Sequence, residues 1–359
     1  MRRSWLSLLA AGLLGLVLGR PAAANHVVMH GGPFAGVVVQ LIAHPEEPGT
    51  LYLAAFGSGV YKSVDGGRQW VASSRGLEDP AVLTLALDPV SPRILYAGTD
   101  SGVFVSRDGG AAWRRAGRAI AARNIRSLVV QPERPTVLYA ATDQGVFWSW
   151  DQGRAWAPRR EGLDARDIRV LRLDPAHPGR IYAGGFGGVY RSEDGGRRWQ
   201  GMNQGLTDRR VRALVLDPTR PDALYAGTAG SGVFVTTDGG GHWEPLNDGL
   251  RNRTVLSLLA TSDGERFAGT VGGVYRWDAA GSSWQLVGED VLTLTVTVVA
   301  TNPHRPGTLY AGTGGLVFVS QDHGRQWREL AVSVAGPAGL RPGASAAGRP
   351  PGASHVERR

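Results

Sequence analysis

Arginines recur at nearly constant spacing through the middle of the chain. One series is separated by 43, 43 and 44 residues, and a second by 43 and 43 residues. Guanidinium groups are planar forks of hydrogen-bond donors that fit carboxylates and phosphates. If the chain folds with the same period, these side chains form an arc that attracts an acidic partner. The first series is Arg123, Arg166, Arg209 and Arg253, the second is Arg126, Arg169 and Arg212, and Arg210 and Arg251 add to them.

A second interpretation of these arginines stays open. The chain has a formal net charge of +8 and carries arginine in many places. Duplicated repeats also inherit positions without selection for binding. A further set recurs just as regularly beside the turns described next, and these side chains are expected to be solvated: Arg68, Arg154, Arg197 and Arg325.

The repeat itself is carried by the motif Ser/Thr-x-Asp-x-Gly-x-x-Trp. Intact copies span residues 63–70, 106–113, 149–156, 192–199, 236–243 and 320–327, and a degenerate copy has Asp278 with Trp284 one position late. Aspartate followed by glycine favours a tight turn, and the tryptophan anchors the next strand by burying apolar surface. The motif residues are therefore predicted to be structural: Asp65, Trp70, Asp108, Trp113, Asp151, Trp156, Asp194, Trp199, Asp238, Trp243, Asp322 and Trp327.

Each repeat contains four short strand-like runs. In the second repeat they cover residues 82–87, 94–99, 102–106 and 112–115. Four strands in about 40 to 45 residues is the proportion of a β-propeller blade. We therefore predict an all-β fold, a single seven-bladed β-propeller of four-stranded antiparallel blades over residues 25–334, with a motif turn in each blade. All nine tyrosines fall at two repeated strand positions and are expected in the core.

The motif resembles the Asp-box, or BNR, repeat of bacterial sialidases, sortilin-type receptors, xyloglucanase-type glycosidases and photosystem II assembly factors. The resemblance covers nearly the whole chain between Gly36 and Val334 and implies the propeller fold. These families share the repeat and little else, so the resemblance leaves the function open. Sialidases of this kind need a tyrosine nucleophile and an early Phe/Tyr-Arg-Ile-Pro signature, which is absent. Xyloglucanase-type enzymes place paired carboxylates between two propellers, whereas this sequence encodes one.

The loops joining the second and third strands begin with a different residue type in different repeats. Phe56 and Phe186 are apolar at this position, whereas Asp100 and Asp143 are carboxylates. We interpret the phenylalanines as part of a binding surface on the arginine-rich face. The two carboxylates either partner neighbouring arginines or form the catalytic pair of a glycosidase.

Tryptophan, cysteine and histidine give little evidence of a binding or metal site. Three tryptophans outside the motif are expected either to stack on a sugar or peptide or to pack between blades: Trp148, Trp150 and Trp277. The chain has no cysteine, and its eight histidines lack the spacing of metal ligands. We therefore expect no metal and no cofactor.

The two ends of the chain differ in composition from the repeats. Residues 1–24 combine Arg2 and Arg3 with an apolar run over 6–19 and a small-residue end, which is typical of a signal peptide. The apolar run is short for a membrane span, so we expect an exported, periplasmic or extracellular protein with no stable span after removal. Residues 335–359 are rich in Gly, Ala, Pro and Arg and are expected to be disordered. Residues 26–29 could add an edge strand to the first blade.

These observations predict an exported, non-catalytic binding or assembly scaffold, similar to the photosystem II assembly-factor type. Its arginine-rich face is expected to hold an acidic protein or peptide segment, for example from a membrane-protein complex. The alternative is a carbohydrate-active protein, either a glycoside hydrolase or a glycan-binding module, with an anionic glycan as ligand. Nucleic acid is not an expected partner, because the export signal is a poor fit to that function.

Overall fold

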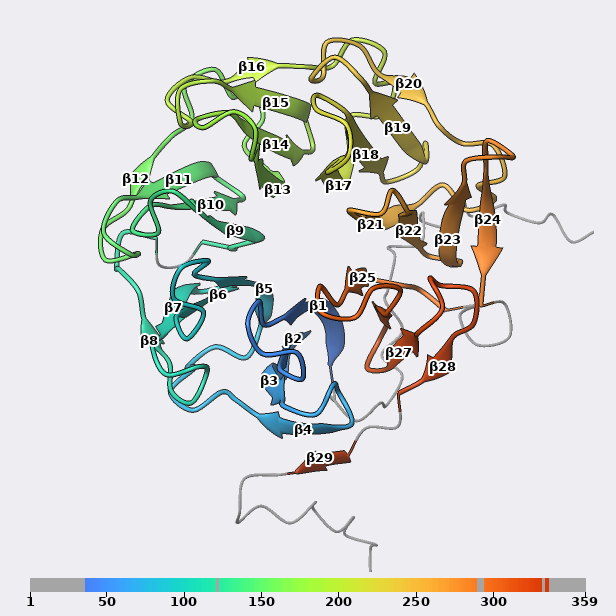
Figure 1. Ribbon diagram of the computed structural model, residues 1–359. Helices are drawn as coiled ribbons and strands as arrows, with labels where there is room; N and C mark the ends of the chain where they lie inside the picture. Colours follow the sequence, from blue (N-terminus) through green and yellow to red (C-terminus); the bar gives the residue numbers. More distant parts are fainter. Residues whose placement is uncertain (1–35, 121–122, 289–293, 331–332, 336–359) are drawn as a thin grey trace, which may run out of the picture.

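Each repeat of the sequence folds into one blade of four antiparallel strands, and seven blades surround a central channel (Figure 1). The computed structural model describes residues 36–120, 123–288, 294–330 and 333–335. The predicted all-β, seven-bladed propeller is confirmed. In the described ranges, no helix is long and apolar enough to cross a membrane. The expected signal peptide, the segment 26–29 and the tail beyond residue 335 lie outside the described residues.

The strands keep the same order in every blade, from the channel outward. The inner strands are β1 (Val37–Ala43), β5 (Val82–Leu87), β9 (Ser127–Val130), β13 (Ile168–Leu173), β17 (Val211–Leu216), β21 (Val255–Ala260) and β25 (Val298–Thr301). The second strands are β2 (Leu51–Phe56), β6 (Leu95–Thr99), β10 (Leu138–Thr142), β14 (Ile181–Gly185), β18 (Leu224–Thr228), β22 (Arg266–Thr270) and β26 (Leu309–Gly312). The third strands are β3 (Gly59–Ser63), β7 (Gly102–Ser106), β11 (Gly145–Ser149), β15 (Gly188–Ser192), β19 (Val233–Thr236), β23 (Gly273–Asp278) and β27 (Val317–Ser320). The outer strands are β4 (Gln69–Ala72), β8 (Arg114–Arg115), β12 (Ala157–Pro158), β16 (Gln200–Gly201), β20 (Glu244–Pro245), β24 (Ser283–Val287) and β28 (Arg328–Glu329).

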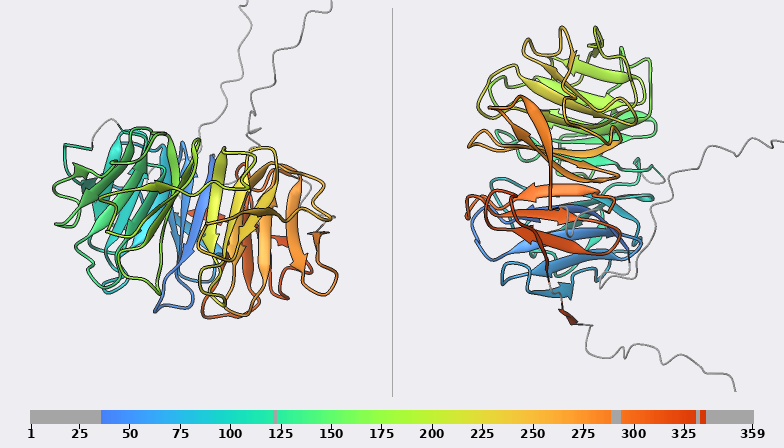
Figure 2. Two further views of the ribbon diagram at one scale, coloured as in Figure 1. Left: turned by 90° about the horizontal axis from the view of Figure 1, so that it is seen from above. Right: turned by 90° about the vertical axis from the view of Figure 1, so that its right-hand side faces the viewer.

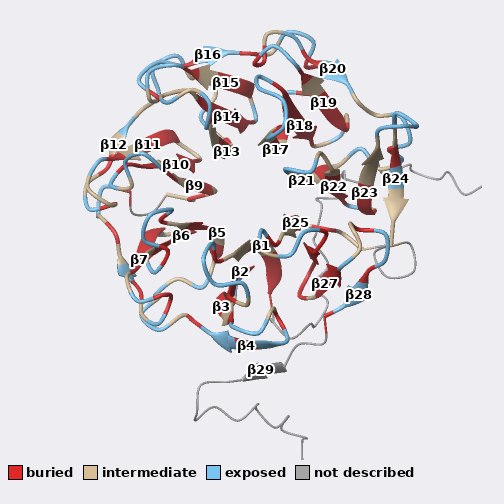
Figure 3. Cartoon of the chain, in the orientation of Figure 1, coloured by how far each residue is buried: buried red, intermediate tan, exposed pale blue. Residues whose placement is uncertain are grey.

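The hydrophobic core lies between neighbouring blades. Figure 2 shows the ring of blades from the side. Seven clusters of buried side chains each combine residues of two adjacent blades, and one of them joins blade 7 to blade 1. Because alternate strand residues face opposite sides, Tyr139 packs against blade 4 and Phe147 against blade 2. All nine tyrosines are buried, as expected. Exposed residues gather in the loops and along the outer strands (Figure 3).

Six turns between third and outer strands share one hydrogen-bond pattern. In blade 1 the Ser63 hydroxyl donates to the Asp65 carboxylate and accepts from the amide of Gly67, both at 2.9 Å. The same carboxylate accepts the amide of Gln69 at 2.9 Å. Blades 2 to 5 and blade 7 repeat these bonds. Gly67 has a φ of 93°, which a residue with a side chain rarely adopts. The motif therefore stabilises the turn through hydrogen bonds among its own residues.

Blade 6 carries the degenerate motif and forms a regular hairpin instead. Strands β23 and β24 pair through Trp277 opposite Trp284 and Asp278 opposite Ser283. The amide of Trp284 still donates to the carbonyl of Asp248 in the preceding connection, at 2.7 Å. Trp284 thus keeps the anchoring position of the motif tryptophan although it stands one residue late in the sequence.

Backbone pairing helps to close the ring between blades 7 and 1 at two levels, in addition to the shared hydrophobic cluster. Near the channel, the amide of Val38 donates to the carbonyl of Thr313 at 3.0 Å. At the rim, β29 (Ser333–Ala335) pairs in parallel with β4, with Val334 opposite Trp70. Figure 1 shows β29 beyond the outer edge of blade 1. The expected end of the propeller at residue 334 falls inside this strand.

Deleting the chain after residue 330 is expected to lower the free energy of unfolding by about 2 kcal/mol. The deletion removes a few backbone hydrogen bonds, worth about 1 kcal/mol each, and exposes the edge of β4. Denaturant unfolding of residues 25–330 beside 25–335 measures the difference. Identical midpoints for the two chains would show that β29 contributes nothing to closure.

Candidate functional site

The inner strands direct one residue of each blade into the channel. In five of them a β-bulge leaves a residue near the strand start unpaired, and a bulge turns such a side chain out of the regular alternation. The equivalent residues of blades 3 and 7 directly precede β9 and β25. Together these positions line one cavity of about 730 Å³, and we name them the mouth ring: Val39, Leu83, Arg126, Arg169, Arg212, Leu256 and Thr297.

The mouth ring is cationic on one side and mostly apolar on the other. Blades 3, 4 and 5 contribute Arg126, Arg169 and Arg212, whereas the other blades contribute valine, leucine or threonine. Phe56 also lines the cavity and is 37% exposed. The cavity therefore suits an occupant that has a negative group on one side and apolar groups on the other.

Two of the three ring arginines share a single carboxylate. Asp167 lies 3.1 Å from a guanidinium nitrogen of Arg126 and 3.1 Å from one of Arg169. The Arg169 guanidinium also lies over the ring of Phe186, 3.9 Å from its centroid, which orders the side chain. Arg212 has no carboxylate within 4.0 Å among the described residues. The buried Nε atoms of Arg169 and Arg212 have no hydrogen-bond partner.

Burial lowers the pKa of the Arg169 and Arg212 guanidinium groups. For Arg169 the neighbouring charge of Arg126 lowers the pKa further, and for Arg212 the charge of Arg210 does so. Arginine nevertheless keeps its charge in proteins. The mouth of the channel thus holds like charges that are partly removed from water, and a bound anion would relieve their repulsion.

A fourth arginine lies deeper in the channel. Arg172 of β13 lines the adjoining cavity of about 630 Å³, and burial lowers the pKa of its guanidinium. It donates to the carbonyl of Leu171 at 2.8 Å, and no described carboxylate pairs with it. In the other blades, the residues paired to the same second-strand position are apolar: Ile42, Ala86, Val129, Val215, Leu259 and Ala300.

The first arginine series lies on the same face as the mouth ring but outside its cavity. The amide of Phe186 donates to the carbonyl of Asp167 at 3.0 Å. This bond joins the loop after the second strand of blade 4 to the loop before its inner strand, so both loops lie on this face. Arg123 is half-buried with its guanidinium 5.8 Å from the centroid of the Phe147 ring. Arg210 pairs with Asp208 at 2.9 Å. The remaining members are exposed and have no described ion pair: Arg166, Arg209, Arg251 and Arg253.

The proposed carboxylate pair is not brought into one cavity. Asp100 lines the mouth cavity, and burial together with the nearby charge of Asp79 raises its pKa. Asp143 is not among the residues that line that cavity, and one of its carboxyl oxygens is buried without a hydrogen-bond partner. Sequence reasoning missed Asp167, the partner of two ring arginines, and the lone Arg172. An alignment of the inner strands would have revealed Arg172, because the other blades have apolar residues at its position.

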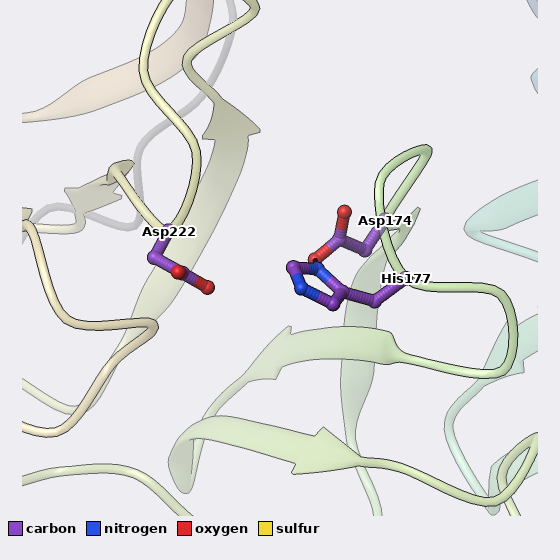
Figure 4. A group of neighbouring side chains, drawn as sticks. All are labelled: Asp174, His177 and Asp222. Atoms are coloured by element: carbon purple, nitrogen blue, oxygen red, sulfur yellow. Dashed lines mark hydrogen bonds and ion pairs between the residues drawn. The ribbon is translucent and has the colours of Figure 1, made fainter.

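The only described group with the spacing of metal ligands lies on the opposite face. Figure 4 shows Asp174 and His177 from one loop facing Asp222 from the next blade. Arg180 already joins them, because its Nη1 atom lies 2.7 Å from Asp222, 3.1 Å from His177 and 3.4 Å from Asp174. The group is therefore an arginine-centred link between blades 4 and 5.

These features define a seven-bladed propeller with a cationic cavity at one mouth of its channel. No known family profile and no curated protein matches the sequence. Solved structures share the fold, so the expected likeness to known propellers is confirmed at the level of the fold.

Three of these structures show the range of proteins that share the fold. A GH74 enzyme of Niastella koreensis has a TM-score of 0.68 and 18% identity over 84% of this chain and 54% of its own. YCF48 bound to D1 peptide has a TM-score of 0.52 and 19% identity over 69% of this chain and 80% of its own. The extracellular domain of a putative one-component system of B. thetaiotaomicron has a TM-score of 0.65 and 19% identity over 79% of this chain and 38% of its own. This chain thus spans about half the length of the GH74 enzyme.

Proposed function

We propose that this protein is an exported, non-catalytic binding scaffold that holds an acidic segment of a partner protein at the mouth ring. The observation that carries the proposal is the excess of positive charge in the cavity. Four arginines line the mouth and the upper channel, and Asp167 and Asp100 are the carboxylates that accompany them. Arg212 and Arg172 therefore keep guanidinium groups available to an incoming carboxylate.

The apolar half of the ring adds a second requirement on the partner. A segment that alternates acidic and apolar residues would place carboxylates against Arg126, Arg169 and Arg212 and apolar side chains against Leu83 and Leu256. The exposed outer arginines would speed its arrival by long-range attraction. YCF48, which shares the fold, has been solved with D1 peptide bound, so a protein of this fold can hold a peptide.

A carbohydrate-active function is the second candidate. Its support is Asp100, a carboxyl group with a raised pKa in the mouth cavity, since such a group can act as a general acid. It also requires a second carboxylate, and Asp143 does not line the same cavity. Hydrolysis of polysaccharides that disappears in Asp100→Asn would favour this function over the scaffold.

A pair of synthetic peptides tests the scaffold. We expect a labelled twelve-residue peptide of alternating aspartate and leucine to bind, and the peptide with asparagine in place of aspartate not to bind. The affinity for the acidic peptide should fall as salt rises, because exposed charges are screened. Fluorescence anisotropy at two ionic strengths measures both effects. Equal binding of the two peptides would contradict the proposal.

A further inference from the structure

A groove opens between blades 3 and 4 on the face that carries the turn motifs, opposite the mouth ring. Its volume is about 360 Å³, and a smaller cavity adjoins it and shares five lining residues with it. Its lining includes Arg134, Arg159, Arg197, Tyr139 and Trp148. Trp148 stands at a third-strand position that is lysine in blade 1 and arginine in blade 4.

The hydroxyl of Tyr139 is available to this groove. In blades 1, 4 and 7 the equivalent tyrosines donate to a carbonyl of the next blade's turn motif: Tyr52, Tyr182 and Tyr310. Tyr139 is only 4% exposed, lines the groove, and makes no such bond in the described structure. Because this hydroxyl makes no bond within the described structure and opens into the groove, it is free to pair with a ligand there.

Three arginines line the groove together with this hydroxyl, and none has a described carboxylate partner. Burial raises the pKa of Tyr139, and the charges of Arg159, Arg134 and Arg197 all oppose that rise, so the three act on one point. None of them has a described ion pair. Asp194 also lines the groove, but its carboxylate accepts the amide of Arg198 and the hydroxyl of Ser192 in the turn motif. Glu133, which is exposed, is the other acid of the groove.

Trp148 gives the groove an aromatic wall, and Trp150 lies beside it. The guanidinium of Arg159 stacks on the ring of Trp148 at 4.2 Å from the centroid. This contact orders Arg159 before any ligand arrives, and pre-ordering reduces the entropy lost on binding. Trp150 lies next to Trp148, with ring centroids 4.9 Å apart, and is 47% exposed. Arg197, expected to be a solvated turn residue, is exposed but lines the groove.

We propose that this groove binds an acidic oligosaccharide, one whose sugar rings carry carboxylates. Arg134, Arg159 and Arg197 would grip a ring carboxylate, and the Tyr139 hydroxyl would bond it or a neighbouring sugar hydroxyl. The apolar face of a second ring would stack on the exposed indole of Trp150. The site is separate from the mouth ring, so the protein would hold a glycan on one face and an acidic protein segment on the other.

Trigalacturonate is a suitable probe, with its fully methyl-esterified form as the uncharged control. We expect the acid to bind with a Kd below about 1 mM and the ester to bind at least about tenfold more weakly, because the ester keeps the rings and loses the charge. Calorimetric titration of the 25–335 chain measures both. Equal affinities of acid and ester, or equally strong competition by inorganic phosphate or the acidic peptide, would overturn the proposal.

The chain itself offers matched variants for this test. Tyr139→Phe removes only the hydroxyl and is expected to weaken trigalacturonate binding about tenfold. Tyr96→Phe makes the same change in blade 2, where the hydroxyl is buried without a partner and no groove arginines surround it, and should leave binding unchanged. Arg159→Gln should also weaken binding, whereas Arg68→Gln on blade 1 should not. Equal effects of Tyr139→Phe and Tyr96→Phe would contradict the assignment. Arg212→Leu at the mouth ring should leave this affinity intact, which separates the two sites.

Discussion

Replacing Arg212 with leucine is expected to weaken binding of the acidic peptide about thirtyfold, or about 2 kcal/mol, without destabilising the fold. Leu83 and Leu256 occupy the equivalent positions of blades 2 and 6, so the mouth ring accommodates leucine. The Arg212 guanidinium is half-buried and lacks a described carboxylate partner, so its removal relieves a desolvation cost. The free energy of unfolding should therefore stay equal or rise while binding is lost.

Two comparisons separate this effect from a general loss of positive charge. Arg68→Leu removes one exposed charge on the opposite face and should change neither property. Replacing the first arginine series, Arg123, Arg166, Arg209 and Arg253, with glutamate should mainly slow association of the peptide and alter the salt dependence of its rate. Charges at the rim of a binding site act chiefly on the rate of encounter. Anisotropy titration and stopped-flow association measure these effects. Wild-type affinity in Arg212→Leu would place the peptide outside the mouth ring.

The fold was predictable because its signals are local. The bonds among Ser63, Asp65 and Gly67 lie within five residues of one another, so the sequence motif contains the whole turn. The same is true of the tyrosines, whose repeat position already assigned them to the core. Ring closure was not predictable in this way, because the pairing of β29 with β4 joins the two ends of the propeller and leaves no local pattern.

The site was predictable only in part. The spacing of Arg126, Arg169 and Arg212 placed them at the starts of the inner strands. It did not distinguish these arginines, which line the cavity, from Arg123 and its series, which lie outside it. The bulge that turns Arg169 and Arg212 into the channel depends on the register with the second strand, which spacing does not report. The sharing of Asp167 by two arginines is a contact across blades and has no sequence signal.

Replacing Trp243 with alanine is expected to lower the free energy of unfolding by about 4 kcal/mol, the largest stability effect we predict. The side chain is 1% exposed and packs between blades 4 and 5 with Met202 and Leu206. Its indole nitrogen donates to the carbonyl of Met202 at 2.9 Å, so alanine leaves both a cavity and an unpaired carbonyl. Denaturant unfolding followed by circular dichroism measures the loss.

Trp150→Ala is the matched control for this prediction. Trp150 is 47% exposed, so its removal should cost less than about 1 kcal/mol of stability. Trp243 lies in a motif on the face opposite the mouth ring, so Trp243→Ala should still bind the acidic peptide at temperatures where it remains folded. Binding lost from a Trp243→Ala protein that unfolds like wild type would instead give the motif a direct part in recognition. We expect a large loss of stability with peptide affinity retained, because Trp243 packs between two blades and lies away from the mouth ring.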